Sequence, residues 1–471
     1  MTYTAASICD NSRHMNASSD NPPDTATLAA RDLRVVWHPC TQMKDHETLP
    51  MIAIRRGSGA WLEDFEGKRY LDAVSSWWVN LFGHANPRIN AALADQMGKL
   101  EHVIFAGFTH EPAVRLAERL VALAPAGLTR CFLADNGSAA VEVAIKMSFH
   151  YWHNRGLKRK TRFMTLQNSY HGETLGALAV GNVELYKTLY KPLLMDVLAA
   201  PTPDCYHRDA GESWEQYSLR QFAHMDLLLQ RHAAELAAVI VEPLVQCAGG
   251  MRMYHPIYLT RLREACTRYG VHLIADEIAV GFGRTGTMFA CEQAAITPDF
   301  LCLSKGLTGG YLPLSAVLTT EDVYAAFYDE YTNLTAFLHS HSYTGNPLAC
   351  SAALATLDIF AADQTIERNR VKAAYLGRRA RSLENHGHVS EVRQCGMIVA
   401  VEVVKDKRSR EPYPWTERRG QRIYRHSLQS GVLLRPIGNV VYFMPPYIVD
   451  EAEMDLMVRV AADGIELATC D

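Results

Sequence analysis

The sequence predicts an α/β fold in which a large domain has a mostly parallel central sheet and the two chain ends form a smaller α+β domain. Between about residues 130 and 320, short apolar runs alternate with longer segments of helical period. These runs lack the strict apolar–polar alternation of a half-exposed strand, which is typical of strands buried on both faces. The six runs are Arg130–Ala134, Phe163–Leu166, Ala237–Val241, Val271–Ala275, Phe300–Leu303 and Leu314–Leu318.

Segments with apolar residues at helical spacing separate these runs. Ala139–Trp152 and Ile257–Tyr269 are the clearest of them. Strands that are joined through helices pair in parallel, because the crossover returns each strand in the same direction. We therefore expect a largely parallel sheet covered by helices.

The two ends of the chain have a different pattern. Gly59–Asp72 is typical of a hairpin, with turn residues at Asp64 and Glu66-Gly67. After about residue 355, helical segments mix with candidate strands near Met397–Val403 and Val440–Met444. We predict a disordered tail over residues 1–30, a small domain built from residues 31–75 and 356–471, and a large domain over residues 76–355.

The composition argues against several classes of protein. The 471 residues are 48% hydrophobic with a formal net charge of −4, which favours neither nucleic acid nor an anionic membrane as a partner. No apolar stretch reaches the roughly 18–20 residues that span a bilayer, and residues 1–30 lack the apolar core of a signal peptide. The 11 cysteines form no C-x-x-C pair, so we predict no metal site and thiols in a reducing cytoplasm.

The turn Asp135–Ser138 lies between a predicted strand and a predicted helix. Gly137 lets the backbone approach a ligand closely. The Ser138 hydroxyl and the free N–H groups of the first helical turn can hold a phosphate. Taken alone, such a turn is more often an ordinary helix cap.

Asp276 directly follows the fourth apolar run. Because strand side chains alternate, Asp276 and Ile278 share a face while Glu277 points away. The carboxyl end of a strand is where α/β sheets bind ligands, and a carboxylate there can keep a pyridinium nitrogen protonated. Ile278 can then pack on the ring. A strand-end acid that pairs with a lysine is the more common alternative for an isolated motif.

An amine and an aromatic ring follow two other predicted strands, at the junction of each strand with its loop. Lys305 lies two residues after the run that ends at Leu303, where burial would lower its pKa and make it a nucleophile. Tyr170, followed by His171, lies after the Phe163 run and can stack on a ring. Each residue alone is more often structural, but their order along successive strands of one sheet places all these groups at one edge.

Together these residues resemble the fold-type I enzymes that use pyridoxal 5'-phosphate (PLP), and within them the class III (ω-) aminotransferases. The resemblance rests on Leu273–Gly286, Pro298-Asp299 and Lys305-Gly306. It implies an enzyme with PLP as its cofactor. It also implies that Lys305 holds PLP covalently and is the catalytic residue, acting as base and acid in the proton transfer.

The same resemblance implies the remaining site residues. The implied cofactor-binding residues are Gly137 and Ser138 at the phosphate, Tyr170 and Ile278 at the ring, Asp276 at the ring nitrogen, Lys305, and Ser342, whose hydroxyl would reach the phosphate in the partner subunit of a homodimer. The implied substrate-binding residues are Trp77, Tyr170, Lys305, Ser340 and Arg435, with Arg435 facing a carboxylate.

A closer resemblance is to the branch of this family that moves the amino group of S-adenosylmethionine to 8-amino-7-oxononanoate, giving 7,8-diaminononanoate in biotin biosynthesis. The motifs that carry it are Trp37-His38-Pro39, Ser75–Trp78, Ala134–Ser138, Gly249–Pro256 and Met444–Tyr447. Two positions depart from the pattern. Cys40 stands where many relatives have a tyrosine beside the substrates, and Glu173 stands where some have aspartate.

Three alternatives remain open at the level of sequence. The chain is another ω-aminotransferase that uses lysine, a diamine, 4-aminobutyrate or β-alanine; the Ser75–Trp78 and Gly249–Pro256 motifs argue against it. A fold-type I lyase, decarboxylase or aminomutase would keep Lys305 and Asp276. A non-catalytic protein of this fold would have no need of an intact Lys305.

Overall fold

The computed structural model describes residues 25–470. The predicted tail therefore lies outside the described residues up to residue 24, and residues 25–30 belong to helix α1 (Thr25–Val35). Within the described part, no helix is both long and apolar enough to cross a membrane.

The chain divides into two compact units. The smaller unit holds the described residues up to Arg56 together with Glu63–Lys68. In it, the Asp64 carboxylate accepts hydrogen bonds from the N–H groups of Glu66 and Lys68, at 3.0 and 2.9 Å. This is the turn that the sequence predicts, and Gly67 adopts the left-handed φ of +84° that the turn requires.

The larger unit contains a seven-stranded sheet in the order β4-β12-β11-β10-β7-β5-β6. Its strands are β4 (Leu128–Ala134), β5 (Arg162–Leu166), β6 (Val197–Ala200), β7 (Leu236–Val241), β10 (His272–Asp276), β11 (Phe300–Leu303) and β12 (Ser315–Thr320). All six predicted runs are strands, and β6 is an addition. Only β12 runs in the opposite direction to the other strands of this sheet, because the segment between β11 and β12 is too short for a crossover. The predicted α/β class is confirmed.

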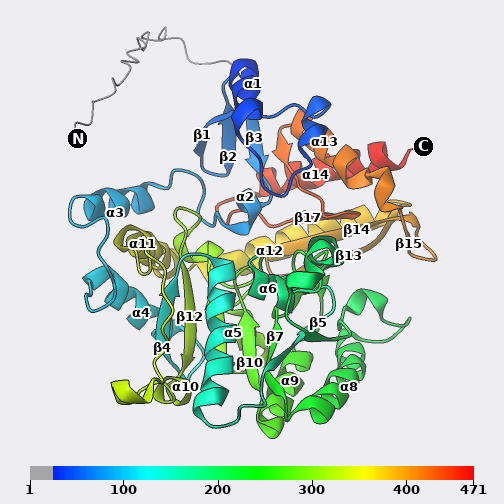
Figure 1. The fold of residues 1–471 in the computed structure, drawn as a ribbon. Helices are drawn as coiled ribbons and strands as arrows, with labels where there is room; N and C mark the ends of the chain where they lie inside the picture. Colours follow the sequence, from blue (N-terminus) through cyan, green and yellow to red (C-terminus); the bar gives the residue numbers. More distant parts are fainter. Residues whose placement is uncertain (1–24, 471) are drawn as a thin grey trace, which may run out of the picture. The chain divides into compact units, whose positions relative to one another are not determined.

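Helices cover both faces of this sheet (Figure 1). Because strand side chains alternate, Ile240 and Ile274 face helix α5 (Gly137–Asn154). Leu273 and Leu301 point to the opposite face, where they share a core with α8 (Trp214–His232) and α9 (Ile257–Tyr269). The sheet is therefore buried on both sides, as the lack of polar alternation indicates.

The first 362 residues hold further elements. They are β1 (Ile54–Ser58), β2 (Trp61–Asp64), α2 (Ser75–Trp78), α3 (Pro87–Met97), α4 (Glu111–Leu123), α6 (Leu175–Val180), α7 (Glu184–Lys187), β8 (Val245–Gln246), β9 (Arg252–Met253), α10 (Glu321–Ala325) and α11 (Pro347–Ala362). Side-chain caps fix several helix starts. Asn136 accepts from the Ala139 N–H at the start of α5, and Ser213 with Gln216 forms a capping box at the start of α8.

The C-terminal part of the larger unit has a second core. Its elements are α12 (Thr365–Arg381), β13 (Val389–Cys395), β14 (Ile398–Asp406), β15 (Glu411–Pro412), α13 (Arg419–Gln429), β16 (Val432–Leu433), β17 (Val440–Phe443) and α14 (Glu451–Thr469). Strand β3 (Arg69–Asp72) pairs in parallel with β16, and Leu71 packs into the same core as Val401 and Met457. The early and late parts of the chain thus share one core, while the domain limits chosen from sequence stay predictions.

Candidate active site

A cavity of about 200 Å³ lies at the carboxyl ends of the parallel strands of the central sheet. Six residues predicted from sequence line it together: Gly137, Ser138, Tyr170, Asp276, Ile278 and Lys305. The other lining residues are Trp78, Asn136, His171, Gly172, Glu242, Ala279 and Val280. Most of these residues follow β4, β5, β7, β10 or β11, and strand ends of this kind are where α/β sheets bind ligands.

Lys305 follows β11 and begins a short 3₁₀ helix. Its φ of +46° is a left-handed conformation, which is uncommon for a residue with a side chain and clusters at functional sites. Its Nζ lies 4.7 Å from the centroid of the Trp78 ring. Burial lowers the pKa of Lys305, against a smaller opposing effect of nearby acidic groups. A lysine amine with a lowered pKa is the nucleophile that attachment to a carbonyl carbon requires.

Asp276 ends β10 and is almost completely buried. Its Oδ2 lies 2.7 Å from His171 Nδ1, and its Oδ1 accepts from the Ile278 N–H at 3.1 Å. The His171 ring is also buried, and its Nε2 lies 3.4 Å from the Thr165 hydroxyl. The carboxylate is therefore held in one orientation at the cavity wall, and His171 is a positioning residue that the sequence analysis did not select.

The start of α5 forms the opposite end of the cavity. Ser138 Oγ accepts from the Glu173 N–H at 3.2 Å. Gly172 has a φ of +124°, and a Cβ at this position would lie 2.1 Å from Ser138 Oγ. Only glycine therefore fits here, because any side chain would displace the serine hydroxyl. A helix start with free N–H groups and a hydroxyl is a site for a phosphate.

Glu242 follows β7 and is buried in the cavity wall beside Tyr170. Its two carboxyl oxygens accept from the backbone N–H groups of Tyr170 and Cys247, at 2.9 and 3.0 Å. Burial, and then the charge of Asp276, raises the pKa of Glu242 to about 8. Glu242 thus fixes the backbone of the aromatic residue, and it comes directly after a predicted strand, which is the signal that could have identified it.

Glu242→Gln is expected to change how the stability of the cofactor-free protein depends on pH. The folded carboxyl titrates at about 8, whereas an unfolded glutamate titrates at about 4.3. Between these values the unfolded chain releases a proton that the folded chain retains, so the free energy of unfolding falls as pH rises, by up to about 1.4 kcal/mol per unit. Urea unfolding between about pH 5 and 8 should show a steeper fall in the unaltered chain than in the variant. The variant keeps the fall due to Glu277, whose pKa burial raises to about 7.

The exposed Glu101→Gln is the matched control and should keep the slope of the unaltered chain. If Glu242→Gln and the unaltered chain have parallel slopes, Glu242 is ionised in the folded protein and this description of the site is wrong.

Trp78, and not the predicted Trp77, lines the cavity. The Trp78 indole N–H donates to the Tyr442 hydroxyl at 3.1 Å, and its carbonyl accepts from the buried Arg284 at 3.3 Å. Ser75, Ser76, Trp77 and Trp78 all have positive φ, between 45° and 74°. This left-handed turn costs roughly 1–2 kcal/mol per residue, and the two tryptophans consequently have different surroundings.

Trp77 and Arg435 lie together outside the cavity. Trp77 is 44% exposed, and the Arg435 guanidinium carbon lies 5.2 Å from the centroid of its ring. Such a pair is attracted through the negative face of the ring. The role of both residues in binding substrate stays a prediction.

Ser340 and Ser342 are exposed and do not line the cavity either. His341 between them has its Nδ1 3.2 Å from Asp135 Oδ2, so this segment lies near the phosphate turn of its own chain. Cys40, which departs from the family pattern, is exposed and belongs to the smaller unit.

The cavity has the chemical groups that PLP requires. A helix start with a serine hydroxyl suits its phosphate, a buried carboxylate suits its ring nitrogen, and an amine of lowered pKa suits its aldehyde carbon. At the end of the cavity where the phosphate would bind, the Gly172 backbone lies so close to Ser138 that a side chain at position 172 would not fit.

The fold and this site define a class of enzyme. Residues 42–463 match the family described as aminotransferase class-III, and the chain belongs to this family. The chain is therefore a PLP-dependent aminotransferase.

Several members of this family with a named activity are similar to the chain. The chain is 45% identical over 444 residues to the adenosylmethionine-8-amino-7-oxononanoate aminotransferase of Geobacter sulfurreducens, covering 94% of this chain and 97% of that one. The solved structure of the enzyme of this name from Methanocaldococcus jannaschii has a TM-score of 0.89 at 40% identity, covering 94% and 99% of the two chains. The structure of an ω-transaminase from Pseudomonas jessenii in complex with PMP (pyridoxamine 5'-phosphate) has a TM-score of 0.89 at 30% identity. The match covers 94% of this chain and 98% of that one.

Proposed function

We propose that this enzyme moves the amino group of S-adenosylmethionine to the keto carbon of 8-amino-7-oxononanoate, giving 7,8-diaminononanoate in biotin biosynthesis. The observation that carries the proposal is the 45% identity to a relative of that name over nearly the whole of both chains. The cavity supports it, because it brings together Lys305, Asp276 and the phosphate turn that a transamination needs.

The residues of the cavity divide the chemistry between them. PLP, when bound, supplies a ring that accepts the negative charge left when a carbon loses its proton. The Asp276 carboxylate, fixed by His171, holds a proton at the ring nitrogen. The Lys305 Nζ takes the proton from the α carbon of the amino donor and, in the second half of the reaction, delivers a proton to the carbon that receives the amino group.

The two substrates differ in charge and shape, and both must contact the same aromatic surfaces. The half-buried Tyr170 and the buried Trp78 present rings to the cavity. An aromatic face attracts a sulfonium cation and also packs against an aliphatic chain. We infer that Arg435, beside Trp77, binds the carboxylate at the far end of the keto acid.

The donor can be identified with the purified PLP-loaded enzyme. S-adenosylmethionine, lysine and 4-aminobutyrate are mixed with it separately, without acceptor, and the absorbance of the cofactor bound to Lys305 is followed through the first half-reaction. We expect only S-adenosylmethionine to convert the cofactor to PMP. Conversion by lysine or 4-aminobutyrate, with none by S-adenosylmethionine, would overturn the substrate assignment and leave the transaminase class unchanged.

A second candidate is another ω-aminotransferase, with a lysine, diamine, 4-aminobutyrate or β-alanine donor. The close structural match to the ω-transaminase of Pseudomonas jessenii favours it. The 30% identity of that match is lower than the 40–45% of the relatives above, so we place it second.

The proposal includes a cytoplasmic homodimer. Ser342 is exposed and outside the cavity of its own chain, which suits a residue that reaches a partner subunit. The cysteines of the described residues are all free thiols, which suits a reducing compartment. Sedimentation should give twice the chain mass of 52.6 kDa; a monomer with full activity would exclude shared active sites.

A further inference from the structure

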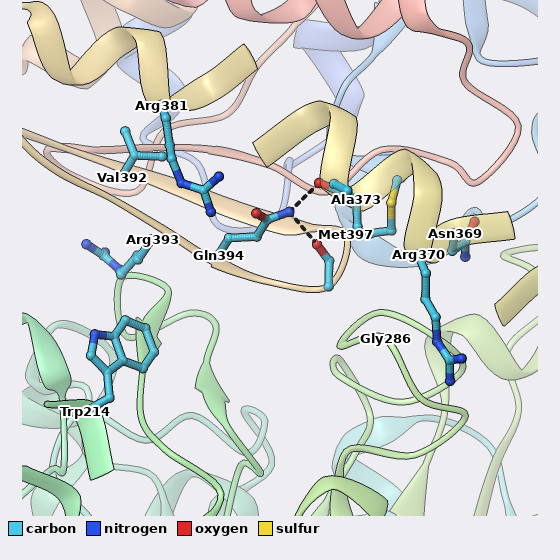
Figure 2. A pocket seen from close by; sticks show the side chains of 12 residues that line it. Trp214, Gly286, Asn369, Arg370, Ala373, Arg381, Val392, Arg393, Gln394 and Met397 are labelled. Atoms are coloured by element: carbon cyan, nitrogen blue, oxygen red, sulfur yellow. Dashed lines mark hydrogen bonds between the residues drawn. The ribbon is translucent and has the colours of Figure 1, made fainter. Parts of the chain in front are cut away.

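The larger unit contains a second cavity, of about 460 Å³, which shares no lining residue with the PLP cavity. It lies between helix α12, the β13–β14 hairpin and the loop at Gly286 (Figure 2). Its lining residues are Trp214, Gly286, Asn369, Arg370, Ala373, Ala374, Arg381, Val392, Arg393, Gln394, Gly396 and Met397. No step of the proposed reaction uses it.

Helix α12 forms one wall of the cavity and places an arginine at each end of it. Arg370 and Arg381 are eleven residues apart, which is about three helical turns, so they lie on the same face with their Cα atoms about 16 Å apart. Ala373 and Ala374 lie between them and end at Cβ, which leaves the space open. Figure 2 shows the two arginines at opposite ends, with Gln394 between them.

The cavity is strongly cationic. Its lining includes three arginines and no acidic residue. Arg393 is fully engaged, since it donates to Glu402 and to the carbonyls of Met251 and Gly250 at 2.7 Å each. Arg370 and Arg381 are exposed and form no ion pair within residues 25–470.

A buried amide at the Arg370 end also lacks a partner. Asn369 is 2% exposed and lines the cavity, and its Nδ2 has no hydrogen-bond acceptor within the described part of the chain. A buried N–H donor without an acceptor is unfavourable, and an anionic oxygen in the cavity would satisfy it. Gln394 has no amide hydrogen left for a ligand, because its Nε2 donates to the carbonyls of Ala373 and Gly396.

We propose that this cavity binds an elongated small molecule with an anionic group at each end, one held by Arg370 and Asn369 and the other by Arg381. Carboxylates and phosphates share the acceptor oxygens that these donors recognise. The proposal does not depend on which amino donor the enzyme uses.

Isothermal titration of the PLP-loaded enzyme tests the proposal, because the bound cofactor keeps phosphate out of the other cavity. The two-ended probes are inorganic tripolyphosphate and suberate, which distinguish phosphate from carboxylate ligands, and the one-ended probes are inorganic phosphate and acetate. At about 0.15 M salt, we expect saturable binding of at least one two-ended probe. Arg370→Gln and Arg381→Gln should each weaken it by about tenfold or more.

Arg378→Gln is the matched control, because Arg378 lies on the same helix but outside the cavity, against the Tyr375 ring. It should leave the affinity unchanged. Arg435→Gln should also leave it unchanged, and this separates the cavity from the predicted carboxylate site. The proposal fails if neither two-ended probe binds, if the one-ended probes bind as tightly, or if Arg378→Gln or Arg435→Gln weakens binding as much as Arg370→Gln.

Discussion

Lys305→Ala is expected to lower turnover by roughly 10⁴-fold or more while the protein stays folded. The substitution removes the amine that attaches the cofactor and moves the proton in both half-reactions. The side chain is half-buried at the cavity, where burial lowers the pKa of its amine, and no other lysine lines the cavity among the described residues. Steady-state kinetics with both substrates measures the loss.

A matched control separates the chemistry from an effect on folding. Lys99→Ala removes an exposed lysine whose amine pairs with Asp95, and it should keep full turnover. A small primary amine added to Lys305→Ala should restore part of the activity, because it supplies the missing proton carrier. Substantial turnover in Lys305→Ala without added amine would overturn the assignment of the catalytic residue.

Asp276→Asn is expected to lower kcat by roughly 10²–10³-fold, the effect of removing one buried electrostatic contact to the reacting system. Asparagine is close to aspartate in size and can still meet His171, but it carries no charge to hold a proton on the ring nitrogen. The affinity for PLP should change less than kcat does. Equilibrium binding of PLP and single-turnover rates measure the two effects separately.

Glu277→Gln is the control for this change, since Glu277 is adjacent, buried and bonded to the N–H groups of Ala290 and Cys291, away from the cavity. Any loss there should appear in stability and not in the kcat of the folded fraction. Equal single-turnover rates for Asp276→Asn and the unaltered enzyme would mean that the carboxylate does not tune the ring.

The central sheet could be predicted because its strands are buried on both faces, so each appears as an apolar run. Strand β6 (Val197–Ala200) was missed; unlike the other strands of similar length it lies at the sheet edge, and three of its four residues are partly exposed. Leu314–Leu318 was identified as a strand, but its antiparallel direction depends on the length of the connection after β11, which periodicity does not reveal.

The site was predictable where a functional residue ends a strand, as Asp276 and Lys305 do. Glu242 has the same position after β7 and was overlooked because no motif was attached to it. Trp78 could not be separated from Trp77 by sequence, since the choice depends on a left-handed turn that a run without glycine does not suggest. The lack of an ion pair at Arg370 and Arg381 could not be predicted either, because it depends on which carboxylates the fold brings within reach.

The buried Arg284 limits how this enzyme can be redesigned. Its guanidinium donates to the carbonyls of Trp78, Asn80, Met444 and Pro445, at distances from 2.7 to 3.4 Å. Backbone carbonyls cannot be changed by substitution. Arg284 therefore connects its own loop to the segments at residues 78–80 and 444–445 whatever side chains those two segments carry. A library of variants that alters the lengths of these segments one at a time will consist mostly of misfolded chains. A chimera that takes all three segments together from a related transaminase keeps the Arg284 hydrogen bonds.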